Sequence, residues 1–185
     1  YHEELNLRVE SLANLGHGVA RHDGWVVHVT NVIPGELVRA RIFRNHKSHS
    51  EADCIEVVEA SPERKNPKCS LYGTCGGCQY QHIDYAAQPD IKLAQVRNLF
   101  ERLGGFSGDL VGELIPCPEP FNYRNRIMVR RQWNILTLRA SYGFLRWDNR
   151  LVVDVERSEN AQVALNDQLK AMRAEPQKRN MKKIF

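Results

Sequence analysis

Apolar and polar residues alternate in short runs over the first sixty positions, and this period of two predicts β-strands. The runs are separated by residues that favour turns. Asp23-Gly24 favours a hairpin, Asn31–Gly35 combines a proline with a glycine, and residues 45–49 form a polar, basic loop. The expected strands cover residues 5–12, 19–22, 25–29, 36–44 and 50–60.

Five short strands joined by close turns predict a small closed barrel of the OB-like kind, with a Greek-key fragment as the alternative. Residues 1–61 are assigned to this barrel. The polar segment Ser61–Lys68 contains two prolines, and we assign residues 62–68 to a linker. Residues 69–185 then form a second domain, so the whole chain is expected to be mainly β, of the α+β class.

The second domain is predicted to combine helices with antiparallel strands. Leu93, Val96, Leu99, Phe100 and Leu103 recur every three or four positions, which indicates an amphipathic helix within 85–103. A shorter helix is expected near the C-terminus. The expected elements after the first helix are strands at 125–132, 135–140, 142–147 and 151–155 and a helix at 161–174.

Composition and charge narrow the function without fixing it. The chain of 185 residues has a net charge of +4 and no apolar run long enough to span a bilayer. No signal peptide is recognisable, so we expect a cytoplasmic location. Lys and Arg outnumber Asp and Glu by eleven to six over residues 131–185, whereas acidic residues exceed basic ones over residues 1–60. A basic face toward nucleic acid is therefore expected in the C-terminal third.

Three of the five cysteines lie in one segment, Cys-Ser-Leu-Tyr-Gly-Thr-Cys-Gly-Gly-Cys. Thiolates this close together usually bind a metal or an iron–sulfur cluster. Cys69, Cys75 and Cys78 could bind zinc together with His82, or a [4Fe–4S] cluster together with a distant fourth ligand. Spacing alone does not distinguish the zinc site from the cluster. A radical enzyme is not indicated, because its motif is C-x3-C-x2-C and the spacing here is C-x5-C-x2-C.

A basic motif, Tyr123-Arg124-Asn125-Arg126, precedes an expected strand that carries Arg130 and Arg131. Arginine suits bidentate contacts to phosphate, and a tyrosine ring can stack on a base. Tyr123 and these four arginines are the candidate RNA contacts. An ordinary solvated strand entry is the alternative explanation of the motif.

Taken in order, these motifs resemble the RNA uracil-5-methyltransferases. Residues 7–60 are similar to a TRAM domain, a small RNA-binding barrel, in Leu15–Ala20 and Ile33–Glu36. The cysteine segment followed by Gln79–His82, and then the Tyr-Arg-Asn-Arg motif, are similar to the central region of that family. The resemblance implies a [4Fe–4S] cluster held by the three cysteines and one later cysteine.

The chain departs from this pattern at the fourth ligand. The stretch that ends in that cysteine in the family is Val153–Ser158 here, so Ser158 stands at the expected position. Serine is a poor iron ligand. The fourth ligand could therefore be Cys117 or a molecule from outside the chain, or the metal site could have been lost. Cys54 falls in an expected strand and is interpreted as a packing thiol.

The family's chemistry uses S-adenosylmethionine as methyl donor, bound by a further domain for which we find no glycine-rich loop in this sequence. The resemblance therefore implies an RNA-recognition part without catalytic residues of its own. Its expected partner is structured ribosomal or transfer RNA, not DNA or a membrane, and it is expected to be a monomer. The alternative function is a non-catalytic RNA-binding module with a Cys3His zinc site.

Overall fold

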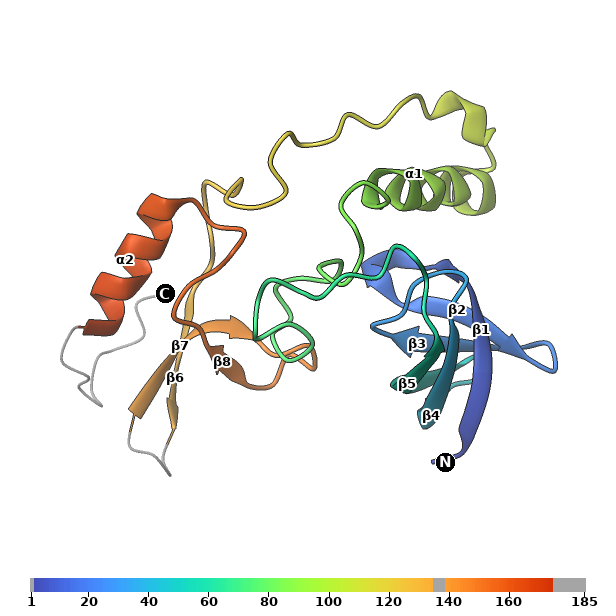
Figure 1. Ribbon diagram of the computed structural model, residues 1–185, viewed down its shortest axis with the longest axis horizontal. Coiled ribbons are helices and arrows are strands. Elements are labelled where there is room, and N and C mark those ends of the chain that lie inside the picture. The colour runs from blue at the N-terminus through green and yellow to red at the C-terminus, as the bar shows by residue number, and fades with distance from the viewer. Residues whose placement is uncertain (1, 135–138, 175–185) are drawn as a thin grey trace. The chain divides into compact units, whose positions relative to one another are not determined.

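The computed structural model describes residues 2–134 and 139–174. It is mainly β, as predicted, with a closed five-stranded barrel, a separate three-stranded sheet and two α-helices (Figure 1). The chain forms two compact units, which are described separately. Unit 1 contains residues 1–66 and 79–116, and unit 2 contains residues 67–78 and 117–185.

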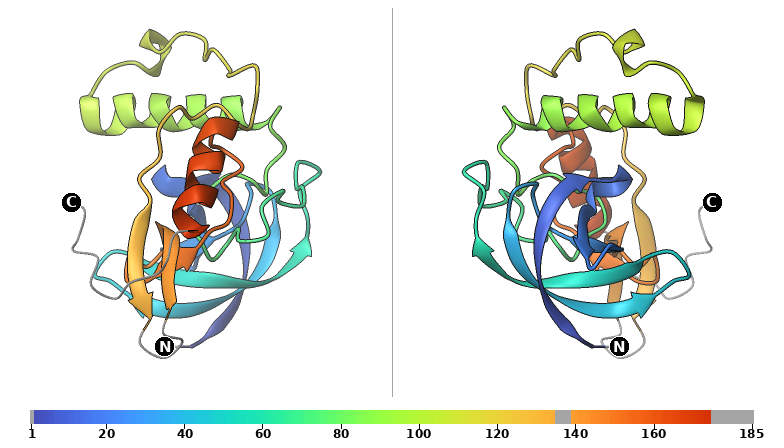
Figure 2. Two further views of the ribbon diagram at one scale, coloured as in Figure 1. Left: turned by 90° about the vertical axis from the view of Figure 1, so that its left-hand side faces the viewer. Right: turned by 90° about the vertical axis from the view of Figure 1, so that its right-hand side faces the viewer.

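Unit 1 is built on the barrel, whose strands pair in the order β1-β2-β3-β5-β4. Four of the five pairings are antiparallel, and β3 with β5 is parallel. Figure 2 shows these strands curving around one another as the sheet closes. The strands are β1 (Glu4–Leu12), β2 (Gly18–His22), β3 (Trp25–Thr30), β4 (Leu37–Asn45) and β5 (Ser50–Glu59).

Every predicted barrel strand is confirmed within two residues at each end, because each alternating pattern matches an inward and an outward face. The Asp23-Gly24 turn joins β2 to β3, and both of its residues have positive φ. The inward side chains form one apolar core. It consists of Leu7, Val9, Ala20, Val27, Val29, Val32, Val38, Ala40, Ile42 and Ala52.

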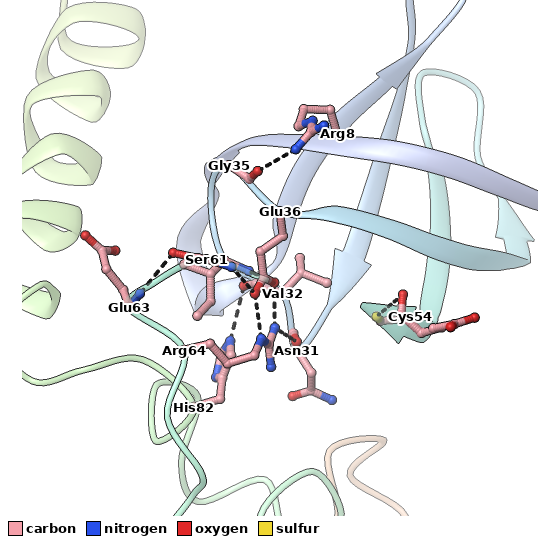
Figure 3. A network of polar contacts seen from close by, with 12 residues as sticks. Arg8, Asn31, Val32, Gly35, Glu36, Cys54, Ser61, Glu63, Arg64 and His82 are labelled. Atoms are coloured by element: carbon pink, nitrogen blue, oxygen red, sulfur yellow. Dashed lines mark hydrogen bonds and ion pairs between the residues drawn. The ribbon is translucent and has the colours of Figure 1, made fainter. Parts of the chain in front are cut away.

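A buried ion pair ties the segment after β5 to the barrel (Figure 3). Glu36 is 0% exposed, and its carboxylate accepts hydrogen bonds from Arg64 Nε at 2.5 Å and Arg64 Nη2 at 2.6 Å. The backbone amides of Ile33 and Ser61 also donate to it. Burial would raise the pKa of Glu36, but these donors outweigh burial and hold the pKa below its usual range.

Residues 61–66 therefore pack with the barrel, although we assigned most of them to a linker. Arg64 and Ile83 form an isolated antiparallel bridge. The amide of Lys65 donates to the carbonyl of His82, and the amide of Asp84 donates to that of Glu63. Residues 79–116 also group with unit 1. In the sequence, the cysteine segment therefore lies between two stretches that belong to the barrel unit.

The predicted first helix is present as α1 (Gln88–Leu99), continued by a π-helical turn (Phe100–Gly104). Its apolar stripe is largely exposed, with Leu103 at 82%. The helix is held by Ile91, which packs on a small apolar cluster of unit 1, and by Gln95, whose side-chain amide donates to the carbonyls of Leu12 and Ala13. Two short 3-10 turns complete unit 1, at Asn14–Gly16 and Gly108–Leu110.

Unit 2 contains the sheet β6 (Arg130–Asn134), β7 (Arg139–Leu145) and β8 (Val152–Asp154), with α2 (Val163–Ala174) packed on it (Figure 1). Its core cluster is small. The fully buried members are Ala140, Tyr142, Val155 and Leu169.

Three strand predictions in unit 2 are wrong in their bounds. Residues 125–129 lie outside any strand. The strands expected at 135–140 and 142–147 form one strand where they are described, because Ala140 and Ser141 both pair with β6 and leave no break. Positions 135–138 lie outside the described residues. None of the helices within the described residues is both long and apolar enough to cross a bilayer.

Candidate metal centre and RNA-contact surface

The cysteine loop, defined here as Cys69–Cys78, is shaped by its own backbone hydrogen bonds. The amide of Tyr72 donates to the carbonyl of Cys69 at 3.1 Å, and the amide of Cys75 donates to that of Leu71 at 2.9 Å. Two successive turns therefore fold the loop back on itself. This folding brings Cys69 toward Cys75 although six positions separate them in sequence.

Gly76 fastens the cysteine loop to β7. Its amide donates to the carbonyl of Leu145 at 2.9 Å, and the neighbouring Cys75 forms an isolated bridge with Arg146. A Cβ atom at Gly76 would lie 3.0 Å from the carbonyl oxygen of Leu145, a backbone atom that cannot move aside alone. The glycine is therefore needed for a close approach between loop and sheet.

The thiols of the loop influence one another. Burial raises the pKa of the Cys75 thiol, and the nearby Cys78 and Cys69 groups raise it further, against a backbone hydrogen bond from Gly77. Without a metal, Cys75 is therefore protonated at neutral pH. A metal would have to displace this proton, since the thiolate is the ligand form.

The turn that carries Ser158 contacts the cysteine loop. Asn160 Nδ2 donates to Cys78 Sγ at 3.2 Å. The turn itself is closed by the amide of Ala161, which donates to the carbonyl of Ser158. Asn166 then holds Ser158 from both sides, because its side chain accepts from the Ser158 amide at 2.8 Å and donates to the Ser158 carbonyl at 3.1 Å.

The other candidate ligands have different surroundings. His82 belongs to unit 1, where it is buried and its Nε2 lies 3.2 Å from the carbonyl oxygen of Val32 (Figure 3). Burial lowers its pKa, as expected for a neutral, packed histidine. Cys54 packs against the barrel core, in agreement with its interpretation as a packing thiol. Cys117 is exposed and lies outside the helices and strands.

The Tyr-Arg-Asn-Arg motif lies beside the turn that carries Ser158. The amide of Arg124 donates to the carbonyl of Asn160 at 2.9 Å, and the carbonyl of Arg124 accepts from Gln162 at 3.0 Å. Tyr123 is 46% exposed, and the guanidinium of Arg124 lies 5.9 Å from its ring centre. Asn160 thus contacts both Cys78 and the backbone of the motif.

The arginines predicted as RNA contacts fall into two groups. Arg124, Arg126 and Arg130 are exposed. Arg131 is half-buried, its Nε donates to Tyr142 Oη at 3.1 Å, and its guanidinium lies 6.0 Å from the Trp133 ring centre. Successive residues of a strand point to opposite faces, so Arg130 and Arg131 differ in exposure although the sequence presents them as a pair.

Sequence reasoning missed the two asparagines that organise the site. Asn160 and Asn166 follow Ser158 in a polar stretch, where asparagine is common for reasons of turn chemistry alone. Lys68 was also missed. Its ammonium lies 3.2 Å from the Glu159 carboxylate and 4.6 Å from the ring centre of Phe121.

No protein-family model matches the chain. Curated proteins match it over most of its length. A protein of Aquifex aeolicus described as an uncharacterized RNA methyltransferase is 37% identical over 163 residues, which cover 88% of this chain and 37% of the relative. One of Bdellovibrio bacteriovorus with the same description is 32% identical and covers 98% of this chain and 44% of the relative.

A solved structure has a similar fold. The tRNA (uracil-54, C5)-methyltransferase of Pyrococcus abyssi, in complex with S-adenosyl-L-homocysteine, aligns with a TM-score of 0.56 and 23% identity. The alignment covers 90% of this chain and 35% of that protein. The chain thus spans less than half the length of these relatives. By sequence it belongs to the family of the RNA methyltransferases.

Proposed function

We propose that this chain is the RNA-recognition part of a uracil-5-methyltransferase that acts on ribosomal or transfer RNA. The observation that carries the proposal is the contact of Asn160 with both the cysteine loop and the backbone of the Tyr-Arg-Asn-Arg motif. The relatives described as RNA methyltransferases support the same assignment. The molecule is expected to act as a cytoplasmic monomer, without affinity for DNA or membranes.

In this proposal, the exposed side chains of the motif grip single-stranded RNA. Tyr123 presents about half of its surface to solvent, so its ring can stack on an unpaired base. Arg124 and Arg126 are exposed and can each bind a phosphate. Arg130 extends the basic surface along β6. Arg131 would act indirectly, because its guanidinium packs against Tyr142 and Trp133.

The cysteine loop would hold a [4Fe–4S] cluster through Cys69, Cys75 and Cys78. The donor set fits, because three soft thiol ligands belong to one loop that its backbone hydrogen bonds fold back on itself. Ser158 would be the fourth residue at the site, supplying a hydroxyl where the family supplies a thiolate. The cluster's contribution would be structural. It would cross-link the loop to the turn on which the RNA-binding motif rests.

The methyl donor S-adenosylmethionine would bind in the part of the relatives' length that this chain does not span. No residue of the chain is assigned to the chemical step. The isolated chain is therefore expected to bind RNA without methylating it. Calorimetry that detected S-adenosylmethionine binding to the isolated chain would contradict the proposal that the methyl donor binds elsewhere.

Salt-dependent RNA binding tests the proposed grip. Arg124→Ala should weaken binding to a structured RNA with an unpaired loop, and should reduce the slope of log affinity against log salt by about 0.7 for a lost single-strand phosphate contact. Arg150→Ala is the matched control, since it removes the same charge from an exposed position of unit 2 outside the motif. Equal losses in both variants would indicate a diffuse charge effect and contradict the assignment.

The alternative is a non-catalytic RNA-binding module with a zinc site formed by the three cysteines and His82. It predicts a colourless protein with one zinc per chain, whereas the cluster predicts a brown protein containing iron and sulfide.

A further inference from the structure

A second group of metal-binding side chains lies on the barrel, in the hairpin between β4 and β5. His46, His49 and Glu51 each offer one ligand atom, and these atoms all lie within 4.8 Å of one another. All three side chains are partly buried and still reachable from solvent. The group lies in unit 1 and contains no cysteine, so it is a different set of ligands from the cysteine loop.

The local backbone explains why the three side chains converge. The amide of His46 donates to the carbonyl of His49 at 2.8 Å, which closes a tight turn at the tip of the hairpin. The two imidazole rings consequently stack, with centres 4.4 Å apart and planes 14° from parallel. Glu51 follows on β5, and its Oε1 lies 3.0 Å from His46 Nε2.

Two neighbouring residues hold these ligands in place. Ser48 Oγ lies 3.3 Å from His49 Nδ1, and a hydroxyl that accepts from one ring nitrogen leaves the other with a free lone pair. His28 of β3 is opposite Glu51 in the parallel strand pairing, and its ring meets the His49 ring edge-on with centres 4.9 Å apart. The group is therefore supported by a second strand as well as by its own hairpin.

We propose that His46, His49 and Glu51 form a binding site for a divalent transition metal of the Zn²⁺ class. Two imidazoles and one carboxylate are a donor set that Zn²⁺ accepts, with water or an additional side chain at the fourth position. His28, whose ring contacts that of His49, is the candidate side chain for that position. Bound metal would fix the hairpin tip and link it to β3.

The simpler reading is that the His46–Glu51 contact is only a hydrogen bond that stiffens the hairpin. The two differ in what they predict for the third residue, because a hydrogen-bonded pair does not need His49. Loss of metal binding on replacing His49 therefore supports a shared metal centre. Absence of metal binding at the hairpin supports the simple pair, and binding unchanged by the loss of His49 contradicts the three-residue site.

Titration of the ¹⁵N-labelled full chain with Co²⁺, a paramagnetic substitute for Zn²⁺, locates the site. We expect the amide signals of residues 46–51 and of β3 to broaden together, separately from any effect on the cysteine loop. His46→Gln and His49→Gln should each weaken this binding by about tenfold or more, given that even outer-shell changes cost that much. Folding of each variant is checked by the Val27 and Val29 amide shifts.

His22→Gln is the matched control, because His22 is an exposed barrel histidine in the β2–β3 hairpin, outside the group. It should leave the affinity unchanged. Broadening confined to the cysteine loop, or an equal loss of affinity in the control and the two variants, would overturn the proposal. Neither result would affect the RNA-recognition function proposed for unit 2.

Discussion

The barrel of unit 1 and the sheet of unit 2 differ in the size of the apolar core that stabilises them. The barrel encloses a continuous apolar core contributed by all five strands, and its strands close on themselves so that no edge is left open. Among the described residues, the sheet of unit 2 has three strands, the shortest of which is Val152–Asp154, and its core cluster contains four buried side chains. Partly buried groups, Cys75 and Leu71 among them, complete that cluster.

This contrast indicates that the two units depend on different interactions. An apolar core supports the barrel without any cofactor. A small core supplies little stability, and small units usually need an additional cross-link. The cysteine loop lies where such a cross-link would act, since it contacts β7 through Gly76 and the Ser158 turn through Cys78.

The largest effect is expected from removing the buried carboxylate of the barrel unit. Glu36→Ala removes a buried carboxylate that accepts from Arg64 and from the amides of Ile33 and Ser61, and breaking a buried pair costs about 3–5 kcal/mol. Urea unfolding followed by the β3 amide signals measures this loss. Glu56→Ala is the control. Its carboxylate also pairs with an arginine, Arg39, but is exposed, so its loss should cost no more than about 1 kcal/mol.

A smaller effect is expected where the cysteine loop meets the sheet. Gly76→Ala places a Cβ against the carbonyl of Leu145, and such overpacking costs about 1–3 kcal/mol. In urea unfolding, the loss of stability should be seen in the β7 amide signals and be absent from those of β3. Gly112→Ala, at a position with open space, should change stability by less than about 0.5 kcal/mol. Equal effects of the two substitutions would contradict the described docking of the loop.

A still smaller effect concerns pH. The pKa of Glu36 is lowered in the folded state, so the folded protein holds this proton less tightly than the unfolded chain does. The resulting stability is present above the unfolded pKa and is lost as the pH falls through the folded pKa. Unfolding of the barrel measured from neutral to acid pH should show this loss, and Glu36→Ala should flatten the profile. An unchanged profile in the variant would show that other carboxylates carry the acid sensitivity.

The sequence predicted the barrel well and the sheet unit less well, for a physical reason. Each barrel strand has one face in the core, so its alternating pattern marks its position. In unit 2, Arg130 and Arg131 are both charged, although one is exposed and the other packs on Tyr142. Charge therefore conceals the alternation there. The apolar stripe of α1 shows the opposite. Its pattern is clear, but several of its side chains are exposed within the described residues.

The candidate site was only partly predictable. The cysteine spacing identified the loop, and Ser158 was identified through resemblance alone. The hydrogen bond from Asn160 to Cys78 and the clamp by Asn166 depend on how distant segments meet. The metal-binding group of the β4–β5 hairpin was missed because its histidines do not follow a known spacing.

The most direct test of the account is the iron and sulfide content of the chain after anaerobic reconstitution, compared between the natural sequence and Ser158→Cys. We expect a brown protein whose iron content per chain rises when Ser158→Cys supplies the fourth thiolate, with stronger protection of the β7 amides from hydrogen exchange. Ser141→Cys, which adds a thiol to β7 rather than to the Ser158 turn, serves as the matched control. A colourless protein in both forms, or an iron content unchanged by Ser158→Cys, would contradict the claim that the cysteine loop and the Ser158 turn share one cluster.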